Sequence, residues 1–459
     1  MEPKTFQDFV EAGGSTSFIS DAIKAHTSSY ACHVARSADN YDRQRNETIN
    51  NYVQTIFSLT GSPVQDYTAA NNKIASNFFN RLNTQRCMYS LGNGITFAED
   101  ESGAIKESLG RDFDQKIQDA GYYALIHGVS FVFWNLDRIH VFPFTEFVPL
   151  FDEYDGTLKA GIRFWRLSKD KPLTAVLYEM DGYTKYQSDE DDALHVVEEK
   201  RAYKQTIATI PADGTSEVIG EENYSALPIV PMYGSRKKQS TLVGMREAID
   251  SYDLIRSGFA NDLTDCAQIY WIIENAGGMD DEDLARLRDR LKLTHMIPVD
   301  SDDGGKVTPY TQEIPYQARK QYLDDIRAGI YEDFGALDVH TVAAGATNDH
   351  IDAAYQPLDE NASDYERQVS EAIKQILSLN GIEAEPVYKR NRISNQMEQV
   401  QIVAMEAQWL DQKTILSKLP NITQEEAQEI LDNIDAEDQG RFVSTKIEEP
   451  TEEDMTKEE

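Results

Sequence analysis

The side chains that most often do chemistry in proteins are present in this chain, but their spacing builds no familiar site. His340 and His350 flank a run of small residues and lack the frame of carboxylates that a metal site needs. The stretch that begins at Asp300 has the glycine of a calcium loop at its sixth position. It then has Thr311 where such a loop requires a bidentate Glu. The phosphate-loop, nucleophile-elbow, HExxH and CxxC patterns are all missing from the sequence. We therefore expect no enzyme, no cofactor and no metal.

Charge and hydropathy limit the function classes further. The 459 residues include 79 acidic and 44 basic side chains, for a net charge of −35. A field this negative repels phosphate, which argues against a simple nucleic-acid-binding domain but allows nucleic acid to pass without being held. A mean hydropathy of −0.53 and the lack of an apolar run near ~20 residues argue against a membrane protein. The first residues lack the basic and apolar regions of a secretory signal, and three widely spaced cysteines fit a reducing compartment.

The pattern of apolar residues changes along the first half of the chain. Residues 1–121 are expected to be mostly helical, with helices over Tyr41–Leu59, Asn71–Leu82 and Ala104–Tyr123, the last one interrupted by Gly110. Residues 128–225 hold short aromatic and β-branched runs separated by turn residues, which predicts a β-rich block. Its acidic stretch around residues 188–200 is expected to be a solvated loop or an edge strand.

Two long amphipathic helices follow. Apolar residues step by three or four over 241–266 and again over 316–334, and a small mixed module lies between these ranges. An uncharged segment, DVHTVAAGATND, comes next, and then a long helix from His350 to Leu379 that contains Pro357. The last residues are acidic and poor in apolar side chains, and we expect them to be disordered. The fold class expected from these elements is α+β.

This order of elements resembles that of the portal proteins of tailed bacteriophages, of the siphophage type. The phrase PFTEFVP lies in the β-rich block and is followed by an Asp-rich turn and the strand-like AGIRFWR. The phrase LPIVPMYG precedes the first long helix, and VYKRNRISN leads to the last helical region. The first long helix carries the remaining matching positions, Asp250, Tyr252, Ser257, Asn261 and Asp262.

The resemblance implies a portal-type fold with a mixed α/β wing, a two-helix stem, a small α/β clip and an α-helical crown. On this reading residues 1–240 form the wing, 241–266 and 316–337 the stem helices, and 267–315 the clip. Residues 338–349 would be a tunnel loop, 350–440 a kinked long helix and the crown, and 441–459 the acidic tail.

The resemblance also implies a function. Such a protein forms a ring, typically a dodecamer, at one capsid vertex of the virion, having assembled in the host cytoplasm. Double-stranded DNA passes through the channel without sequence readout, and the partners are the major capsid protein, scaffolding protein, terminase and head–tail adaptor. Acidic side chains on a channel wall would repel the duplex and keep its passage smooth. The alternative is another ring-forming virion connector without DNA passage.

Two groups of residues are singled out as candidate sites. The resemblance places the tunnel loop against the DNA channel, at Val339, His340, Thr341, Val342, Ala343, Ala344, Gly345, Ala346, Thr347 and Asn348. The stem helices have too little partner surface within one chain, so they are expected to pack on neighbouring copies. The stem packing residues are Leu242, Met245, Ile249, Tyr252, Phe259, Leu323, Ile326, Ile330 and Phe334.

Overall fold

The chain divides into two compact units. One comprises residues 1–336 and 358–391, and the other comprises 337–357 and 392–459. The computed structural model describes residues 2–57, 62–65, 70–98, 100, 103–168, 170–189, 193–209, 216–266, 270–274, 306–310, 315–339 and 347–392. It also describes 282–283, 286, 403, 405–406, 409, 415 and 430. The first unit contains every strand of these described residues.

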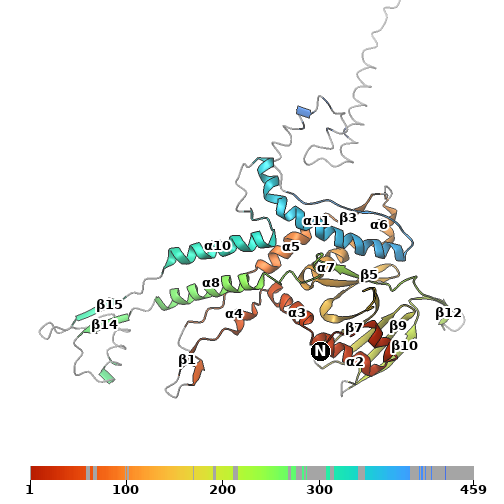
Figure 1. Cartoon of the computed structure of the whole chain (residues 1–459), viewed down its shortest axis with the longest axis horizontal. Coiled ribbons are helices and arrows are strands. Elements are labelled where there is room, and N and C mark those ends of the chain that lie inside the picture. Colours follow the sequence, from red (N-terminus) through yellow and green to blue (C-terminus); the bar gives the residue numbers. More distant parts are fainter. Residues whose placement is uncertain are drawn as a thin grey trace, which may run out of the picture. The chain divides into compact units, whose positions relative to one another are not determined.

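Helices dominate the first part of the chain, as expected (Figure 1). Side chains of Thr5, Ser15, Ser29 and Asn46 each accept a backbone hydrogen bond and so fix where four of these helices begin. The helices are α1 (Phe6–Glu11), α2 (Thr16–Thr27), α3 (Tyr30–Asp42), α4 (Glu47–Asn51), α5 (Phe78–Leu91), α6 (Ala104–Ser108) and α7 (Phe113–His127). The break that Gly110 predicted lies between α6 and α7, where this glycine adopts a φ of 89°.

Two of the predicted helices are wrong in their extent. The helix expected over Tyr41–Leu59 ends at Asp42, because Gln44 adopts a left-handed conformation, and only the short α4 follows before strand β1 (Thr55–Phe57). The helix expected over Asn71–Leu82 begins only at Phe78, since the backbone N–H groups of Asn72, Ile74 and Ser76 donate to side chains of another segment.

Antiparallel sheets make up the β-rich block, as predicted. One sheet has the strand order β13–β4–β5, and the other has the order β10–β9–β8–β7–β6. The strands of the first are β4 (Val129–Asn135), β5 (Arg138–Pro143) and β13 (Ile229–Tyr233). Those of the second are β6 (Phe147–Phe151), β7 (Leu158–Trp165), β8 (Thr174–Glu179), β9 (Gly182–Ser188) and β10 (Leu194–Arg201). Residues 194–200 of the acidic stretch lie in β10, an edge strand of this sheet, so the expectation of an edge strand holds for this part.

Four two-stranded pairings complete the sheets of the described residues. Each is antiparallel. They join β1 to β2 (Pro63–Gln65), β11 (Lys204–Thr209) to β12 (Ser216–Glu222), β14 (Tyr270–Glu274) to β15 (Lys306–Tyr310), and β3 (Ile95–Phe97) to β16 (Pro386–Tyr388). The strand expected around QIYWIIEN is therefore present as β14.

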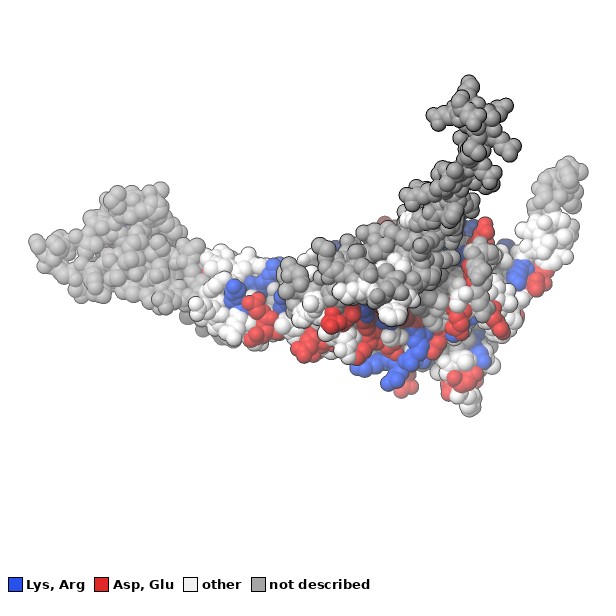
Figure 2. Space-filling view, turned by 90° about the horizontal axis from the view of Figure 1, so that it is seen from above, with Lys and Arg blue, Asp and Glu red and all other residues white. Residues whose placement is uncertain are grey.

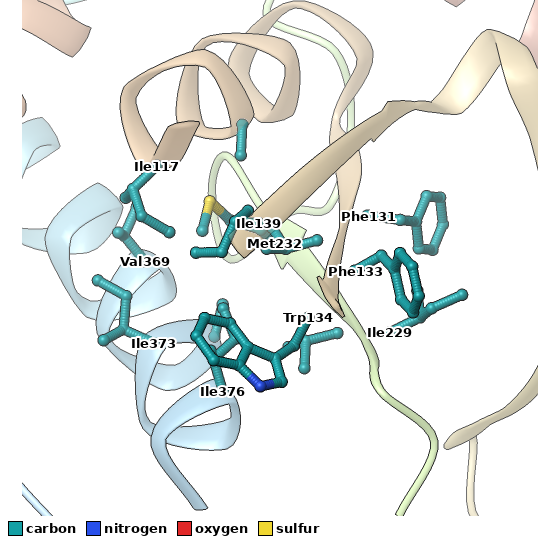
Figure 3. Close-up of a cluster of buried hydrophobic side chains, with 14 of the residues drawn as sticks. Ile117, Phe131, Phe133, Trp134, Ile139, Ile229, Met232, Val369, Ile373 and Ile376 are labelled. Atoms are coloured by element: carbon teal, nitrogen blue, oxygen red, sulfur yellow. The ribbon is translucent and has the colours of Figure 1, made fainter. Parts of the chain in front are cut away.

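The main core lies between the three-stranded sheet and two helices, α7 and the long helix α11 (Asn348–Leu379). Figure 3 shows Trp134 and Ile139 of this sheet beside Val369, Ile373 and Ile376 from the C-terminal part of α11. All five side chains are almost entirely buried. One face of the five-stranded sheet packs on α1 and α2 in a separate core. Because side chains alternate along its strands, this sheet contributes one face to the core with α1 and α2 and the opposite face to the main core.

The long helices follow the predicted ranges closely, with one difference. Helix α10 spans Tyr316–Phe334, as predicted, but α8 (Arg246–Cys266) begins later than the expected residue 241. Residues 241–245 form turns, because Gly244 has a φ of 89° that a regular helix does not use. Helix α11 retains Pro357 within its length, and Gly381, with a φ of 68°, follows its end. Helices and antiparallel sheets together confirm the α+β class.

Candidate functional site

Helices α8 and α10 run antiparallel. The ring of Phe259, late in α8, lies 5.8 Å from that of Tyr316 at the start of α10. Asp262 forms an ion pair with Arg319 at the same end. At the other end, Phe78 contacts both Tyr252 of α8 and Tyr331 of α10. Figure 1 shows the two helices side by side, and the β14–β15 pair is formed by the residues that follow α8 and precede α10.

The base of this helix pair packs on the N-terminal helices of the same chain. Leu242, Met245 and Ile249 share one buried cluster with Ile330 and Phe334. The cluster also includes side chains from α3, α5 and α7, namely Ala38, Tyr41, Phe78, Phe79, Leu82 and Ile126. Tyr252 and Ile326 pack against its edge, whereas Phe259 and Leu323 are half-buried further along the helices. Five of the nine predicted stem packing residues thus lie in a core within one chain, where packing on neighbouring copies was expected, because α3, α5 and α7 cover the base of the pair.

Further from the base, the helices expose large apolar side chains. Leu254 and Leu263 of α8 are 41% and 54% exposed, and Tyr316 and Tyr322 of α10 are 55% and 48% exposed. Leu254 and Tyr322 border a cleft of about 560 Å³ between the two helices and the segment around Lys73. Several large apolar side chains in the half of the pair away from the base are therefore left exposed by this chain's described residues.

A strap of residues 70–77 binds along α8. The backbone N–H groups of Asn72, Ile74 and Ser76 donate to side chains of α8 at 2.6, 3.0 and 2.9 Å. The acceptors are Asn261, Ser257 and Asp253, in that order.

The spacing of these bonds has a simple physical basis. Alternate residues of an extended chain lie roughly 6.6 Å apart, and residues four apart in a helix rise about 6 Å. Three donors can therefore match three acceptors only if the strap is extended and runs antiparallel to the helix. This explains why residues 71–77 are not helical.

The two aspartates of α8 nearest its base belong to a polar cluster. Asp253 is fully buried and also accepts from the side-chain amide of Asn46 at 2.8 Å. Burial raises its pKa, and the hydrogen bonds from Ser76 and Asn46 oppose that rise. Asp250 accepts from the hydroxyls of Tyr41 and Thr48. Burial and the bond to Asp250 both raise the pKa of Tyr41.

These contacts explain the positions that carried the resemblance in the first long helix. Asp250, Ser257 and Asn261 hold the N-terminal region against α8, and Asp262 joins α8 to α10. Sequence reasoning missed Asn46, Asp253 and the strap, because their roles depend on a contact between segments far apart in the chain. The sequence offered one sign of the strap. The range predicted as a helix over Asn71–Leu82 begins with several Asn and Ser residues, which are poor helix formers.

The predicted tunnel loop lies mostly outside the described residues. Of its ten positions the structure describes Val339, which is 51% exposed, Thr347, which is exposed, and Asn348, which begins α11. Among the described residues no group of His, Cys, Asp or Glu is arranged to hold a metal ion. No helix in the described ranges is both long and apolar enough to cross a bilayer.

Charged residues of both signs lie on the described surface. Figure 2 shows Lys and Arg interspersed with Asp and Glu on the face it draws. The sequences of α8 and α10 together hold nine acidic and five basic side chains. Asp324 and Asp325 of α10 are exposed and lie outside the buried cluster at its base. The sequences of the helix pair therefore hold a modest excess of acid.

Comparison with known proteins identifies the family. The family model described as phage portal protein, SPP1 Gp6-like, matches residues 33–440. The chain belongs to this family of phage portal proteins. The portal protein of Clostridium phage phiCD119 is 25% identical over 381 residues, covering 76% of this chain and 82% of the relative. The portal protein of Bacillus phage SPP1 is 22% identical over 338 residues, covering 70% of this chain and 64% of the relative.

A solved structure is also similar in part. A chain from the neck of a native GTA particle, computed with C12 symmetry, is 12% identical with a TM-score of 0.41. The match covers 75% of this chain and 90% of that chain. The family match and the two portal relatives confirm the predicted function class. This portal protein is a structural component of a phage particle, a connector at the capsid vertex.

Proposed function

We propose that this portal protein forms a ring, of about twelve copies, whose channel conducts double-stranded DNA during packaging and ejection. Residues 241–266 and 316–337 would be the stem, 267–315 the clip, and 338–349 the tunnel loop. Residues 1–240 would form the wing, 350–440 the kinked helix and crown, and 441–459 an acidic tail. The protein would assemble in the host cytoplasm and have no enzymatic activity of its own.

The exposed apolar half of the α8–α10 pair is the observation that carries the ring. Leu254, Leu263 and Tyr322 are each more than two-fifths exposed. Monomeric proteins rarely leave such side chains together on one long projection, because burying them is favourable. A neighbouring copy in a head-to-tail ring would cover them, since one face of the pair can meet a different face of the next copy.

Native mass tests the ring directly. Mass photometry of the purified chain of 51.9 kDa should give a species of roughly 600 kDa, about twelve times the chain mass. Leu263→Asp combined with Tyr322→Asp should reduce this species strongly, because two charges would then face the neighbour. Leu167→Asp is a matched control, since Leu167 is 85% exposed on the loop after β7. A wild-type monomer at all salt concentrations, or equal ring loss in the control, would contradict the proposal.

DNA passage calls for a different experiment. An uncharged tunnel loop could lie near the duplex without forming salt bridges to it. Ala344→Arg or Ala346→Arg should slow or stall packaging in an in vitro reaction while rings still assemble. Ala344→Gln adds length without charge and is expected to package faster than the Arg variant. Normal packaging by both Arg variants would count against placing this loop at the channel wall.

Partners follow from the same assignment. The clip would meet the terminase during packaging and the head–tail adaptor afterwards, and the outer parts of the ring would meet the major capsid protein and scaffolding protein. Competition between a terminase and an adaptor for the assembled ring tests the shared clip. Simultaneous saturation by both would refute it.

A further inference from the structure

A cleft of about 350 Å³ lies between the two sheets of the β-rich block. Its aromatic walls come from both sheets, with Phe133 and Phe142 on one side and Trp165 and Tyr178 on the other. Arg163 of β7 also lines it. The alternation of the strand explains this placement. Since Ala160, Ile162 and Phe164 face the core shared with α1 and α2, Arg163 and Trp165 must face the first sheet.

Pairing between the strands places a row of side chains across the floor of the cleft. Arg163 lies opposite Val176, Val176 opposite Lys185, and Lys185 opposite Glu198. The last two residues of this row, Lys185 and Glu198, form an ion pair, since the Lys185 ammonium lies 3.2 Å from a Glu198 carboxylate oxygen. Lys185 is thereby neutralised, and Arg163 is left as the charge at the inner end.

Arg163 is held by aromatic rings. Its guanidinium carbon lies 4.3 Å from the centre of the Phe142 ring and 4.6 Å from that of Trp165. Its Nε is buried and has no hydrogen-bond partner among the described residues. Within that same part of the chain no carboxylate forms a salt bridge with it, although acidic side chains outnumber basic ones by 79 to 44. Arg246, Arg319 and Arg390, by contrast, each pair with at least one carboxylate.

We propose that this cleft binds a carboxylate carried by a peptide segment of another protein chain, with an adjacent aromatic or aliphatic side chain seated on the rings. A guanidinium already stacked between two rings keeps its N–H donors oriented, which suits the two oxygens of a carboxylate. The volume falls within the range of small ligand sites and accommodates one or two residues.

Charge distinguishes a carboxylate from a phosphate here. His140 also lines the cleft, and burial together with Arg163 lowers its pKa, so it adds no positive charge near neutral pH. Burial raises the pKa of Tyr178 to about 12, so its hydroxyl stays neutral beside Arg163. The paired Glu198 lies at the same site and disfavours a ligand with two negative charges. Since Lys185 and Glu198 neutralise each other, the one positive charge that remains among the described residues of the cleft is that of Arg163, which matches a singly charged ligand best.

Calorimetric titration of the full-length protein with short peptides tests the proposal. The probes are N-acetyl-Leu-Phe with a free carboxylate, the same peptide as its amide, and N-acetyl-Phe-Glu amide. We expect either N-acetyl-Leu-Phe or N-acetyl-Phe-Glu amide to bind at least tenfold more tightly than N-acetyl-Leu-Phe amide, which has no carboxylate. Tighter binding of N-acetyl-Leu-Phe would identify a chain terminus as the source of the carboxylate, and tighter binding of N-acetyl-Phe-Glu amide would identify an acidic side chain.

Variants separate the site from non-specific binding. Arg163→Gln should weaken binding of the carboxylate peptide at least tenfold, whereas Arg138→Gln should not change it. Arg138 is an exposed arginine of the neighbouring sheet that pairs only with the adjacent Asp137 among the described residues, so it loses the same charge outside the cleft. If Arg163→Gln fails to fold, Arg163→Lys keeps the charge without the planar fork and should weaken binding several-fold.

Equal affinity of the peptide acid and its amide would overturn the proposal. So would unchanged binding by Arg163→Gln or Arg163→Lys, or displacement of the peptide by inorganic phosphate at lower concentration than by acetate. The readout is peptide binding and not DNA packaging, so it does not depend on the ring or the channel.

Discussion

Exchanging the charge between Asp253 and Asn46 tests how α8 is fixed to the N-terminal region. Asp253 is fully buried, accepts from the Ser76 backbone N–H through one oxygen, and accepts from the Asn46 amide through the other. Asp253→Asn keeps the shape of the side chain but turns one acceptor into a donor that faces the amide of Asn46. Asn46 cannot rotate to compensate, because its own oxygen already accepts from Ile49 N–H, which a rotated amide would meet with a second donor.

The magnitude follows from the cost of unsatisfied buried donors. Leaving a buried polar group without its partner costs about 1–3 kcal/mol, so Asp253→Asn should cost about 2 kcal/mol. Asn46→Asp should cost at least as much, because two carboxylates would then face each other inside the protein. When both substitutions are combined, the new carboxylate at position 46 accepts from the new amide at position 253 and still accepts from Ile49 N–H. The amide oxygen at position 253 then accepts from Ser76 N–H. The double variant should therefore recover most of the loss, and the two single effects should not add.

Hydrogen exchange of the strap measures this locally. The amides of Ile74 and Ser76 are protected by their bonds to α8, and about 2 kcal/mol corresponds to roughly a thirtyfold loss of protection. Asp324→Asn on the exposed side of α10 is a control that should change nothing there. Unchanged protection in Asp253→Asn would refute the reasoning. A double variant no better than the worse single one would refute it equally, because the charge exchange would then have restored nothing.

Three further predictions concern the packing of the same unit. Gly121→Ala would place a methyl group 2.1 Å from the hydroxyl oxygen of Tyr365, so thermal unfolding should reveal a loss of about 1–3 kcal/mol that Tyr365→Phe partly recovers. Burial lowers the pKa of His26 below its ordinary 6.5, and its Nε2 lies 2.8 Å from the Phe144 carbonyl oxygen. The folded state therefore binds this proton less well than the unfolded chain, and stability should fall as the pH drops from 6.5 towards the lowered pKa. His26→Gln should make thermal stability between pH 7 and pH 5 less steep, and an unchanged slope would count against this group. Arg390 forms a bidentate pair and a further bond to carboxylates of α11, so Arg390→Lys should raise hydrogen exchange in residues 386–391 several-fold, and equal exchange would show that the fork contributes little.

The larger elements could be predicted from the sequence because their signals are local. Apolar residues recurring every three or four positions predicted α10 at its observed bounds and α8 within five residues of its observed start. Alternating aromatic and β-branched runs predicted the sheets, and Gly110 predicted the break between α6 and α7. The capsid connector itself was predicted from the order of short phrases, and the family match confirms it.

The candidate site was predicted only in part. The sequence assigned Ile249 and Ile330 to packing on neighbouring copies, whereas both lie in a buried cluster with α3, α5 and α7 of the same chain. It predicted a helix over Asn71–Leu82, where the strap forms in residues 70–77. Helical propensity contributes only a few tenths of a kcal/mol per residue to stability. In the strap this contribution is outweighed by the hydrogen bonds that every second backbone N–H forms with α8.

Local rules thus determined the class of this protein, the two long helices, the β-rich block and the lack of any familiar catalytic motif. The tertiary structure alone decided that Asp253 would be a buried acceptor and that Arg163 would lie between two aromatic rings, paired with no acid of the described residues. Both depend on segments that are distant in sequence. Periodicity shows which face of an element is apolar, but it does not show which other element that face will meet.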